Sequence, residues 1–587
     1  MKIAITGAGI ICAAGITPRE VFESIRCRRS GVDTMCHLHS RHSNFPVGEV
    51  KMSNDELAEK CGLTAGKTYS RTFLMGVYAV RQALDSARVS ADGMADNACR
   101  VALVNGTTVG GMDVSEKMLF SGNPDKDFLR EHDCGACTRA IALTAWSGFD
   151  SYTTVSTACS SAANAIAVGA EMIRNGEADI VVAGGTEALS LFHFNGFRSL
   201  MILDEHRSRP FDATRAGLNL GEGAGYIVLE KYYSARRRHA GVLGWLAGWG
   251  VACDAYHPTA SSPEGAGAVE AMRRALAMAQ LEPHNISYIN AHGTGTPNND
   301  VSESAALRTV FGAALPPVSS TKPYTGHTTS ACGGIEAVIS LLAIKEGFMP
   351  GNPGIINPDP DCVEPTQGGQ SPRIINVMSN SFGFGGNDTS LIFSKREAGH
   401  LPVINRGTKL KVGTPAFVRC ADELQRLGKY LNPRDTRRMG QLMKASLLTS
   451  FEALEQAGLE KPDAIISATV YGCMANSEQI LREMIADAGE SVSPTLFMQS
   501  THNTIAGNIA IRLKCHGYNM TISNGAESAR DAVKLAQRLI RGGEARNVLV
   551  GIHEECTPLF RSLIDEKKLD VELPDEVFSQ SFVISEE

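Results

Sequence analysis

Short apolar runs alternate along the chain with longer segments that repeat apolar residues at helical spacing. The runs are rich in Val, Ile and Thr, as buried strands are, and Gly or Asn residues bound them. Strands are expected at residues 2–6, 101–105, 152–156 and 180–183, and helices at 18–26, 70–87 and directly after Cys159. This alternation predicts a layered α/β fold around a central sheet.

The same alternation resumes after a polar joint at residues 234–241. A strand at 226–229 precedes the joint; after it, strands are expected at 242–251, 286–290, 374–378 and 389–393, and helices at 266–279, from Val301 and at 335–346. Two α/β units therefore precede residue 396, one over residues 1–240 and one over 241–396. A Gly7-x-Gly9 turn lacks the third glycine and the early helix of a dinucleotide site, so we interpret it as a strand end.

Composition excludes several classes of function. The net charge of −7 favours neither nucleic acid nor an anionic surface, and no apolar run is long enough for membrane insertion. Fifteen scattered cysteines are typical of reduced thiols, which predicts a cytoplasmic protein. Cys134 and Cys137 have the spacing of a zinc or redox pair but no second pair, so we expect a structural role and no metal.

Cys159 lies where a β-favouring run ends and a helix begins, with apolar residues at Ala162, Ile166 and Ala170 behind it. A thiol at a helix start is favoured as the thiolate by unpaired backbone N–H groups and the helix dipole. Alone, such a cysteine is more often a small buried residue. Its function depends on what surrounds it.

Two distant polar loops supply the partners. His292 follows an apolar strand, and Lys322 and His327 follow another, with Glu336 on the helix behind. Either histidine alone would usually be structural. Together they suit one chemistry, because neutral imidazoles can donate hydrogen bonds to a developing enolate or oxyanion. Lys322 can support that charge, and Glu336 can orient its neighbours.

Residues 1–396 resemble the β-ketoacyl synthases, decarboxylating condensing enzymes of fatty-acid and polyketide assembly. The resemblance implies a thiolase-like fold of two βαβαβ halves in α-β-α-β-α layers. It rests on four motifs in family order, which are Thr157-Ala158-Cys159-Ser160-Ser161, His292-Gly293-Thr294-Gly295-Thr296, Lys322 with Gly326-His327, and Asn380-Ser381-Phe382-Gly383-Phe384-Gly385-Gly386.

The resemblance also implies roles. Cys159 takes the acyl chain as a thioester, His292 and His327 stabilise the enolate of decarboxylated malonyl carrier protein, and Phe384 gates the pocket and shares the oxyanion hole with Cys159. Thr294 and Thr296 hold the pantetheine arm, and Arg209 faces the acyl carrier protein. The resemblance implies a homodimer, and no cofactor is expected.

Some residues qualify the resemblance. Asn387-Asp388 replaces the more frequent Thr-Asn, so the hydrogen bonding of that turn is open. The residues around Phe197 resemble a subgroup from polyene and secondary lipid clusters. Lys67 and Arg71 are candidates to join Arg209 at the carrier-protein surface, with solvated surface charge as the alternative.

The C-terminal part repeats the beginning. Arg541-Gly542-Gly543-Glu544-Ala545 matches Arg174-Asn175-Gly176-Glu177-Ala178 at an offset of 367 (543 − 176). That offset places Ala526 on Cys159. After a linker at 397–410, residues 411–587 are therefore predicted to form a degenerate half domain without thiol or catalytic histidines, whose cysteines and His502 and His516 are structural. Its open sheet face must pack on the first domain, on a partner or on itself.

Two other functions were weighed. A non-catalytic chain-length or scaffolding subunit has the same fold, but the first copy keeps Cys159, His292, His327 and Lys322. A non-decarboxylating thiolase typically has a second cysteine near the last glycine loop, where this chain has Ser381-Phe382-Gly383-Phe384. The sequence therefore favours an acyltransferase that condenses malonyl units with an acyl chain on Cys159.

Overall fold

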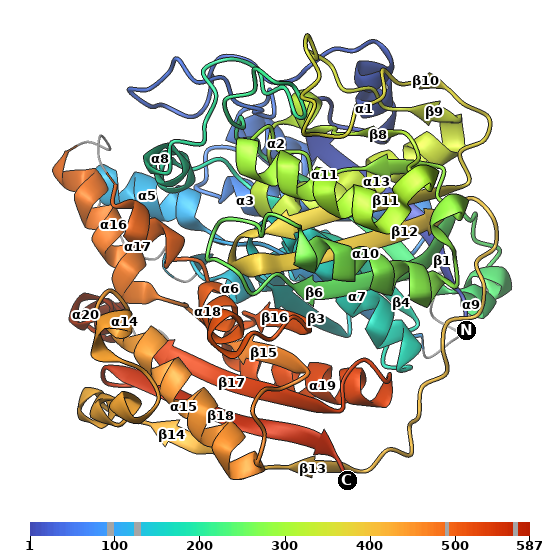
Figure 1. Ribbon diagram of the computed structural model, residues 1–587. Helices are drawn as coiled ribbons and strands as arrows, with labels where there is room; N and C mark the ends of the chain where they lie inside the picture. The colour runs from blue at the N-terminus through green and yellow to red at the C-terminus, as the bar shows by residue number, and fades with distance from the viewer. Residues whose placement is uncertain (91–98, 123–128, 130, 488–491, 568–572) are drawn as a thin grey trace.

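One mixed sheet of 16 strands runs through the computed structural model (Figure 1). The structure describes residues 1–90, 99–122, 129, 131–487, 492–567 and 573–587. The strand order is β13-β18-β17-β15-β16-β3-β2-β4-β5-β1-β6-β12-β11-β7-β8, with β14 paired to β18. Among the described residues no helix is long and apolar enough to span a membrane.

Residues 1–396, here called the catalytic part, contribute ten strands to this sheet in two halves, and β9 and β10 form a separate two-stranded sheet. Parallel pairing joins β2 to β3 and β4, and antiparallel pairing adds β5 and β1. The N-terminal strands are β1 (Ile3–Cys12), β2 (Val101–Gly106), β3 (Ser151–Val155), β4 (Ile180–Glu187) and β5 (Gly223–Lys231). The C-terminal strands are β6 (Gly244–Cys253), β7 (Tyr288–Asn290), β8 (Val318–Ser319), β11 (Asn376–Gly383) and β12 (Asn387–Ser394).

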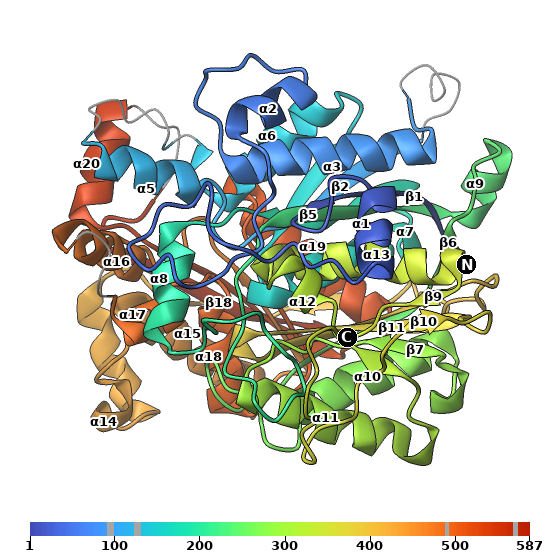
Figure 2. The same cartoon turned by 90° about the horizontal axis from the view of Figure 1, so that it is seen from above.

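Helices cover both faces and fill the space between the halves, as Figure 2 shows. The middle layer is α7 (Ser161–Arg174) and α13 (Cys332–Glu346), and the outer layers are α3 (Arg71–Ala87) with α6 (Cys134–Ala145) and α10 (Ala266–Ala279) with α11 (Pro297–Phe311). This confirms the layered thiolase-like fold. The other elements here are α1 (Pro18–Arg26), α2 (Asn54–Lys60), α5 (Met112–Phe120), α8 (Leu191–Ser199), α9 (Tyr232–Arg237), η3 (Pro283–Asn285), η4 (Gly312–Ala314), α12 (Lys322–Thr325), β9 (Phe348–Met349) and β10 (Gly369–Gln370).

Local sequence explains several of these bounds. Thr17 caps α1 by accepting from the Glu20 backbone N–H at 3.3 Å, and the Glu20 carboxylate accepts from Ile16 at 2.8 Å. Strand β1 is longer than predicted because Gly7 and Gly9 lie inside it. A side chain at Gly7 would come within 2.2 Å of the Ala83 carbonyl oxygen, so the glycine lets α3 pack directly on the strand.

Residues after the linker form a further α/β unit that continues the sheet. Its strand β16 pairs antiparallel with β3 at Ile522 and Val155, flanked by the bonds Ser156 N to Thr521 O and Ser523 N to Thr154 O, 3.0 and 3.1 Å. We call this the C-terminal unit; it lies below the catalytic part in Figure 1. Its strands are β13 (Leu410–Val412), β14 (Ala416–Val418), β15 (Ala464–Ala468), β16 (Tyr518–Ile522), β17 (Asn547–Glu555) and β18 (Val577–Glu586).

The C-terminal unit is tied to the catalytic part by packing and charge. Helix α19 contacts α7, and the Arg538 guanidinium donates to both oxygens of Glu177 at 2.6 Å. Helices α19 and α15 of the unit cover the two faces of its own sheet, and the unit meets the first domain through the β16 edge and α19. Its apolar surface is thus buried partly on itself and partly on the first domain. Its helices are η7 (Ala421–Lys429), α14 (Pro433–Thr436), α15 (Gln441–Ala457), α16 (Met474–Ala486), α17 (Pro494–Met498), α18 (Thr504–Leu513), η8 (Gly525–Glu527), α19 (Ser528–Arg541) and α20 (Pro558–Lys567).

Candidate active site

Cys159 lies at a sharp corner between β3 and α7. Ala158 has a positive φ of 49°, a conformation that costs energy for a residue with a Cβ, and the one-turn helix η2 (Ala158–Ser160) follows. The backbone N–H of Thr157 donates to the Ser161 hydroxyl at 2.9 Å, which holds the turn. The thiol is 5% exposed and lines two cavities that meet at this corner.

Burial opposes the thiolate that the helix start predicts for Cys159. Burial raises the pKa of the Cys159 thiol to about 12, although Lys322 and the backbone N–H groups of Phe384 and Cys159 lower it. Loss of hydration therefore outweighs the helix start. The two N–H groups are nonetheless close enough to bond the sulfur, which is where an oxyanion hole for a thioester on Cys159 would be.

His292 follows β7, and hydrogen bonds to its backbone hold it in place. The carboxylate of Glu303 accepts from the N–H groups of His292 and Gly293 at 2.9 and 2.8 Å. The Lys322 ammonium lies 3.4 Å from Nδ1 of His292 and can only donate, so the ring proton belongs on Nε2. Burial first, and then Lys322, lower the pKa of His292 well below 6.5, which keeps the ring neutral.

His327 has the same tautomer for a different reason. The backbone N–H of Thr329 donates to Nδ1 of His327 at 3.1 Å, which leaves Nε2 to carry the proton. Burial lowers the pKa of this imidazole well below 6.5 too. The two rings are 5.5 Å apart between centroids and nearly perpendicular, at 86°. The site thus holds two neutral imidazole donors side by side.

Lys322 and Glu336 form a buried pair behind the histidines. The Lys322 ammonium donates to Glu336 Oε1 at 2.6 Å and to the His292 carbonyl oxygen at 2.5 Å. Burial alone would lower the pKa of Lys322, but Glu336 outweighs it and raises that pKa. The positive charge therefore stays beside His292, where it can support charge that develops at the site.

Phe384 lies on the glycine loop η6 (Phe384–Gly386) between β11 and β12. Its ring stacks on Phe197 of α8, with centroids 5.7 Å apart and planes at 22°. The amide of Asn503, in the C-terminal unit, donates to the Phe384 carbonyl oxygen and to Asn387 Oδ1, both at 2.7 Å. A second unit of the chain thus holds the loop that carries the predicted oxyanion donor.

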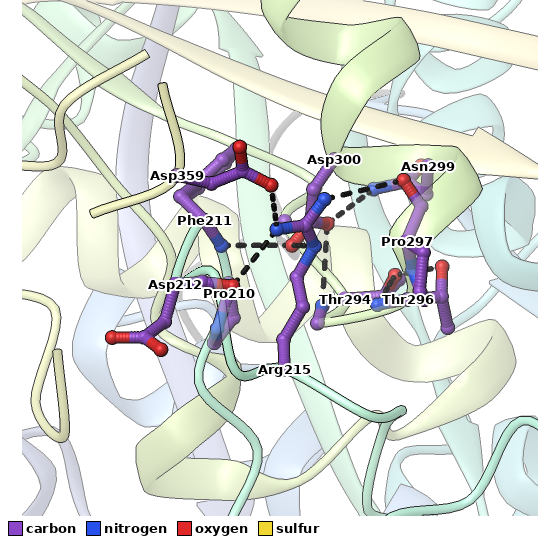
Figure 3. A network of polar contacts seen from close by, with 12 residues as sticks. Pro210, Phe211, Asp212, Arg215, Thr294, Thr296, Pro297, Asn299, Asp300 and Asp359 are labelled. Carbon is purple, nitrogen blue, oxygen red and sulfur yellow. Dashed lines mark hydrogen bonds and ion pairs between the residues drawn. The ribbon is translucent and has the colours of Figure 1, made fainter. Parts of the chain in front are cut away.

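One cavity leads from Cys159 to the predicted pantetheine residues. Thr294 and Thr296 line it, and their hydroxyls are 2.9 Å apart. Figure 3 shows how this loop is fixed. The Asp300 carboxylate accepts from the backbone N–H groups of Phe211 and Gly295 at 2.8 and 3.2 Å, and Arg215 lies 3.5 Å from Asp300 and 2.5 Å from Asp359.

The other cavity extends from Cys159 to the C-terminal unit. Phe192 and Phe197 of α8 line its wall together with Cys159. Its remaining lining includes His132, Cys134, His193, Val470, Tyr471, Met474, Phe497 and His502. The pocket is thus built by two units of the chain, and His502, expected to be only structural, lines it with its Nδ1 3.8 Å from the Cys134 sulfur.

The predicted carrier-protein residues are placed differently from one another. Arg71 is buried in a 2.7 Å ion pair with Glu222, so the expectation that it faces a partner is wrong. Arg209 is half-buried and bonds the Thr214 carbonyl oxygen at 3.0 Å. Lys67 is exposed.

The C-terminal unit repeats the nucleophile corner without its sulfur. Strand β16, η8 and α19 follow each other as β3, η2 and α7 do, at the offset found in the sequence (528 − 161 = 367). Ala526 stands where Cys159 stands in the first copy. Reasoning from the sequence missed Glu303, Asn503 and His193, which belong to no recognised motif; the Asn503 contacts also come from a distant segment.

Fold and site together define a thiol-dependent acyltransferase of the thiolase-like class. The family model described as "Beta-ketoacyl synthase, N-terminal domain" matches residues 1–235 and 394–562, and "Beta-ketoacyl synthase, C-terminal domain" matches 243–355. The chain belongs to the β-ketoacyl synthase family.

Relatives and solved structures agree with this assignment. A 3-oxoacyl-[acyl-carrier-protein] synthase 2 of Synechocystis sp. is 35% identical over 413 residues, 67% of this chain and 98% of the relative. The ishigamide ketosynthase/chain length factor matches 67% of this chain and 99% of that chain, at 32% identity and a TM-score of 0.62. The PfaC keto synthase-chain length factor matches 100% of this chain and 78% of that chain, at a TM-score of 0.77; at 17% identity it shows the fold alone.

Proposed function

We propose that this β-ketoacyl synthase carries its acyl chain on Cys159 and extends it with malonyl units from an acyl carrier protein. The observation that carries this proposal is the position of Cys159 where two cavities meet. One cavity passes Thr294 and Thr296 and suits a pantetheine arm, while the other has aromatic walls and suits an acyl chain. A thiol between them can receive the chain from one side and hold it in the other.

In the first step the Cys159 sulfur attacks the thioester carbonyl carbon. A new C–S bond forms, the bond to the carrier thiol breaks, and the proton that leaves Cys159 goes to the departing thiolate. The N–H groups of Cys159 and Phe384 bond the carbonyl oxygen while it is negative. The raised pKa of Cys159 makes this proton transfer part of the barrier.

In the second step malonyl carrier protein enters the same cavity. The bond between the malonyl α-carbon and its carboxylate breaks, and CO2 leaves. The electron pair forms an enolate, whose oxygen accepts hydrogen bonds from Nε2–H of His292 and of His327. The enolate carbon then attacks the acyl-Cys159 carbonyl, a C–C bond forms, and the cysteine sulfur leaves. Neutral donors suit this role, since both imidazoles have a pKa well below 6.5.

We also propose that the C-terminal unit limits chain length, because Tyr471, Met474 and Phe497 line the acyl cavity. The alternative of a non-catalytic chain-length or scaffolding subunit is less well supported, since the first copy retains every group used above. The homodimer implied by the resemblance would need a surface other than the β3 edge, which β16 already occupies. We propose that the acyl chains are fatty-acid or polyketide chains, polyene chains among them. We also propose a cytoplasmic location.

Peptide mapping tests the assignment of Cys159. The full-length protein incubated with octanoyl pantetheine should gain one acyl group, located on the peptide that contains Cys159. The variant Cys159→Ala should gain none. Acylation of Cys159→Ala at the wild-type rate would show that another group carries the chain.

A further inference from the structure

His193 is a buried histidine that the steps above do not use. It lies on α8, is 4% exposed and lines the acyl cavity together with Cys159. Its ring meets the edges of Phe192 and Phe197, at centroid distances of 6.3 and 6.4 Å. Phe197 in turn lies 6.3 Å from His327, so His193 is one aromatic ring away from the catalytic histidines.

The ring nitrogens of His193 have no hydrogen-bond partner in the part of the chain that the structure describes. Only its backbone N–H is bonded, to the Ser190 hydroxyl at 3.1 Å. Burial lowers the pKa of the ring to about 4, so it is neutral, with one N–H donor and one acceptor nitrogen. A histidine that lines a cavity with both ring nitrogens unpaired is placed to pair with a polar group on a bound chain.

A second unpaired polar group lines the same cavity. The hydroxyl of Thr329, two residues after His327, is buried and lacks a partner among the described residues. The same lining also includes the apolar side chains of Val109, Met112 and Phe497. A plain hydrocarbon chain would satisfy these walls but would leave both polar groups unpaired.

We propose that His193 binds an oxygen substituent, keto or hydroxyl, on the acyl chain attached to Cys159. The ring can donate to a keto oxygen, and it can donate to or accept from a hydroxyl. Because His193 is one ring away from His327, the oxygen belongs to the part of the chain near the thioester. This specificity deepens the proposed function and rests on acylation of Cys159.

Matched acyl thioesters test the preference. Acylation of Cys159 in the full-length protein is followed by intact-protein mass spectrometry, with octanoyl pantetheine compared with its 3-, 5- and 7-hydroxy and 3-, 5- and 7-oxo analogues. At least one oxygenated chain should react about tenfold faster than octanoyl, the value of one hydrogen bond of about 1.4 kcal/mol. In His193→Phe that ratio should fall to about one, while octanoyl still reacts.

Two further variants separate binding from structure. His193→Gln keeps an N–H donor and should retain part of the preference, whereas Phe192→Leu changes the cavity wall without changing a polar group and should keep the full ratio. Equal ratios in wild type and His193→Phe, as expected if only water meets the ring, would overturn the assignment and leave the proposed function intact. Failure of every thioester to acylate Cys159 would overturn both.

Discussion

Asn503 is the residue through which the C-terminal unit holds the catalytic glycine loop. It precedes α18, and its amide nitrogen donates to the Phe384 carbonyl oxygen and to Asn387 Oδ1, both at 2.7 Å. Replacing Asn503 with Ala removes both bonds and leaves two acceptors without this donor. Asn503 bonds the carbonyl oxygen of Phe384, and the backbone N–H of Phe384 is the predicted oxyanion donor.

The size of the effect follows from those two bonds. Each is worth about 1 kcal/mol net, and an acceptor left buried without a partner adds to the loss. A total of about 2 kcal/mol corresponds to roughly 30-fold, since about 1.4 kcal/mol is a factor of ten. We therefore expect Asn503→Ala to acylate Cys159 about 30-fold more slowly than the wild type.

The assay is the rate of Cys159 acylation by octanoyl pantetheine, with thermal unfolding measured in parallel. Asn508→Ala is the matched control, because among the described residues the Asn508 amide bonds only Thr504 of the same helix, 2.8 Å from its carbonyl oxygen. A rate within twofold of wild type for Asn503→Ala would refute the reasoning. An equal loss in Asn508→Ala would point to general loosening of α18 instead.

Three further predictions concern protonation, charge and space. Burial raises the pKa of Cys159 to about 12, so the thiolate fraction should rise with pH between 6 and 9. The acylation rate should rise with it, and a rate that reaches a plateau below pH 8 would contradict this prediction. Lys322→Met removes the donor to Glu336 and His292, so decarboxylation of malonyl carrier protein, measured as CO2 release, should fall about 100-fold; wild-type release would contradict the role of the charge. Met474→Trp fills part of the acyl cavity, so tetradecanoyl pantetheine should lose far more acylation rate than butanoyl pantetheine, and equal losses would contradict a role of the C-terminal unit in chain length.

Elements with local signals could be predicted closely. The Thr17 cap and Pro18 define the start of α1, and the periodic apolar residues of α10 give its bounds, 266–279. The sequence predicts that α11 begins at Val301, because the residues before it are polar, whereas the helix begins at Pro297. Strand β1 was cut short because Gly7 and Gly9 indicate a turn locally, whereas their function is to admit α3.

Tertiary contacts explain what could not be predicted. Asn387 replaces a residue that is more often Thr in the family, and nothing near it in the sequence explains the change. Its side chain donates to the Asn519 carbonyl oxygen at 2.9 Å and accepts from Asn503, and both partners belong to the C-terminal unit. The thiolate prediction for Cys159 took account of the helix start but not of burial. His193 and Glu303 lie outside the four motifs, and only the fold shows that His193 lines the same cavity as Cys159.

The central claim is that Cys159 carries the chain through a decarboxylative condensation. Its most direct test is to load Cys159 with octanoyl pantetheine, add malonyl carrier protein and follow both proteins by intact-protein mass spectrometry. We expect Cys159 to lose its octanoyl group while the carrier gains that group and loses CO2, giving a 3-oxodecanoyl carrier. A carrier that stays malonylated beside a stably acylated Cys159 would contradict it.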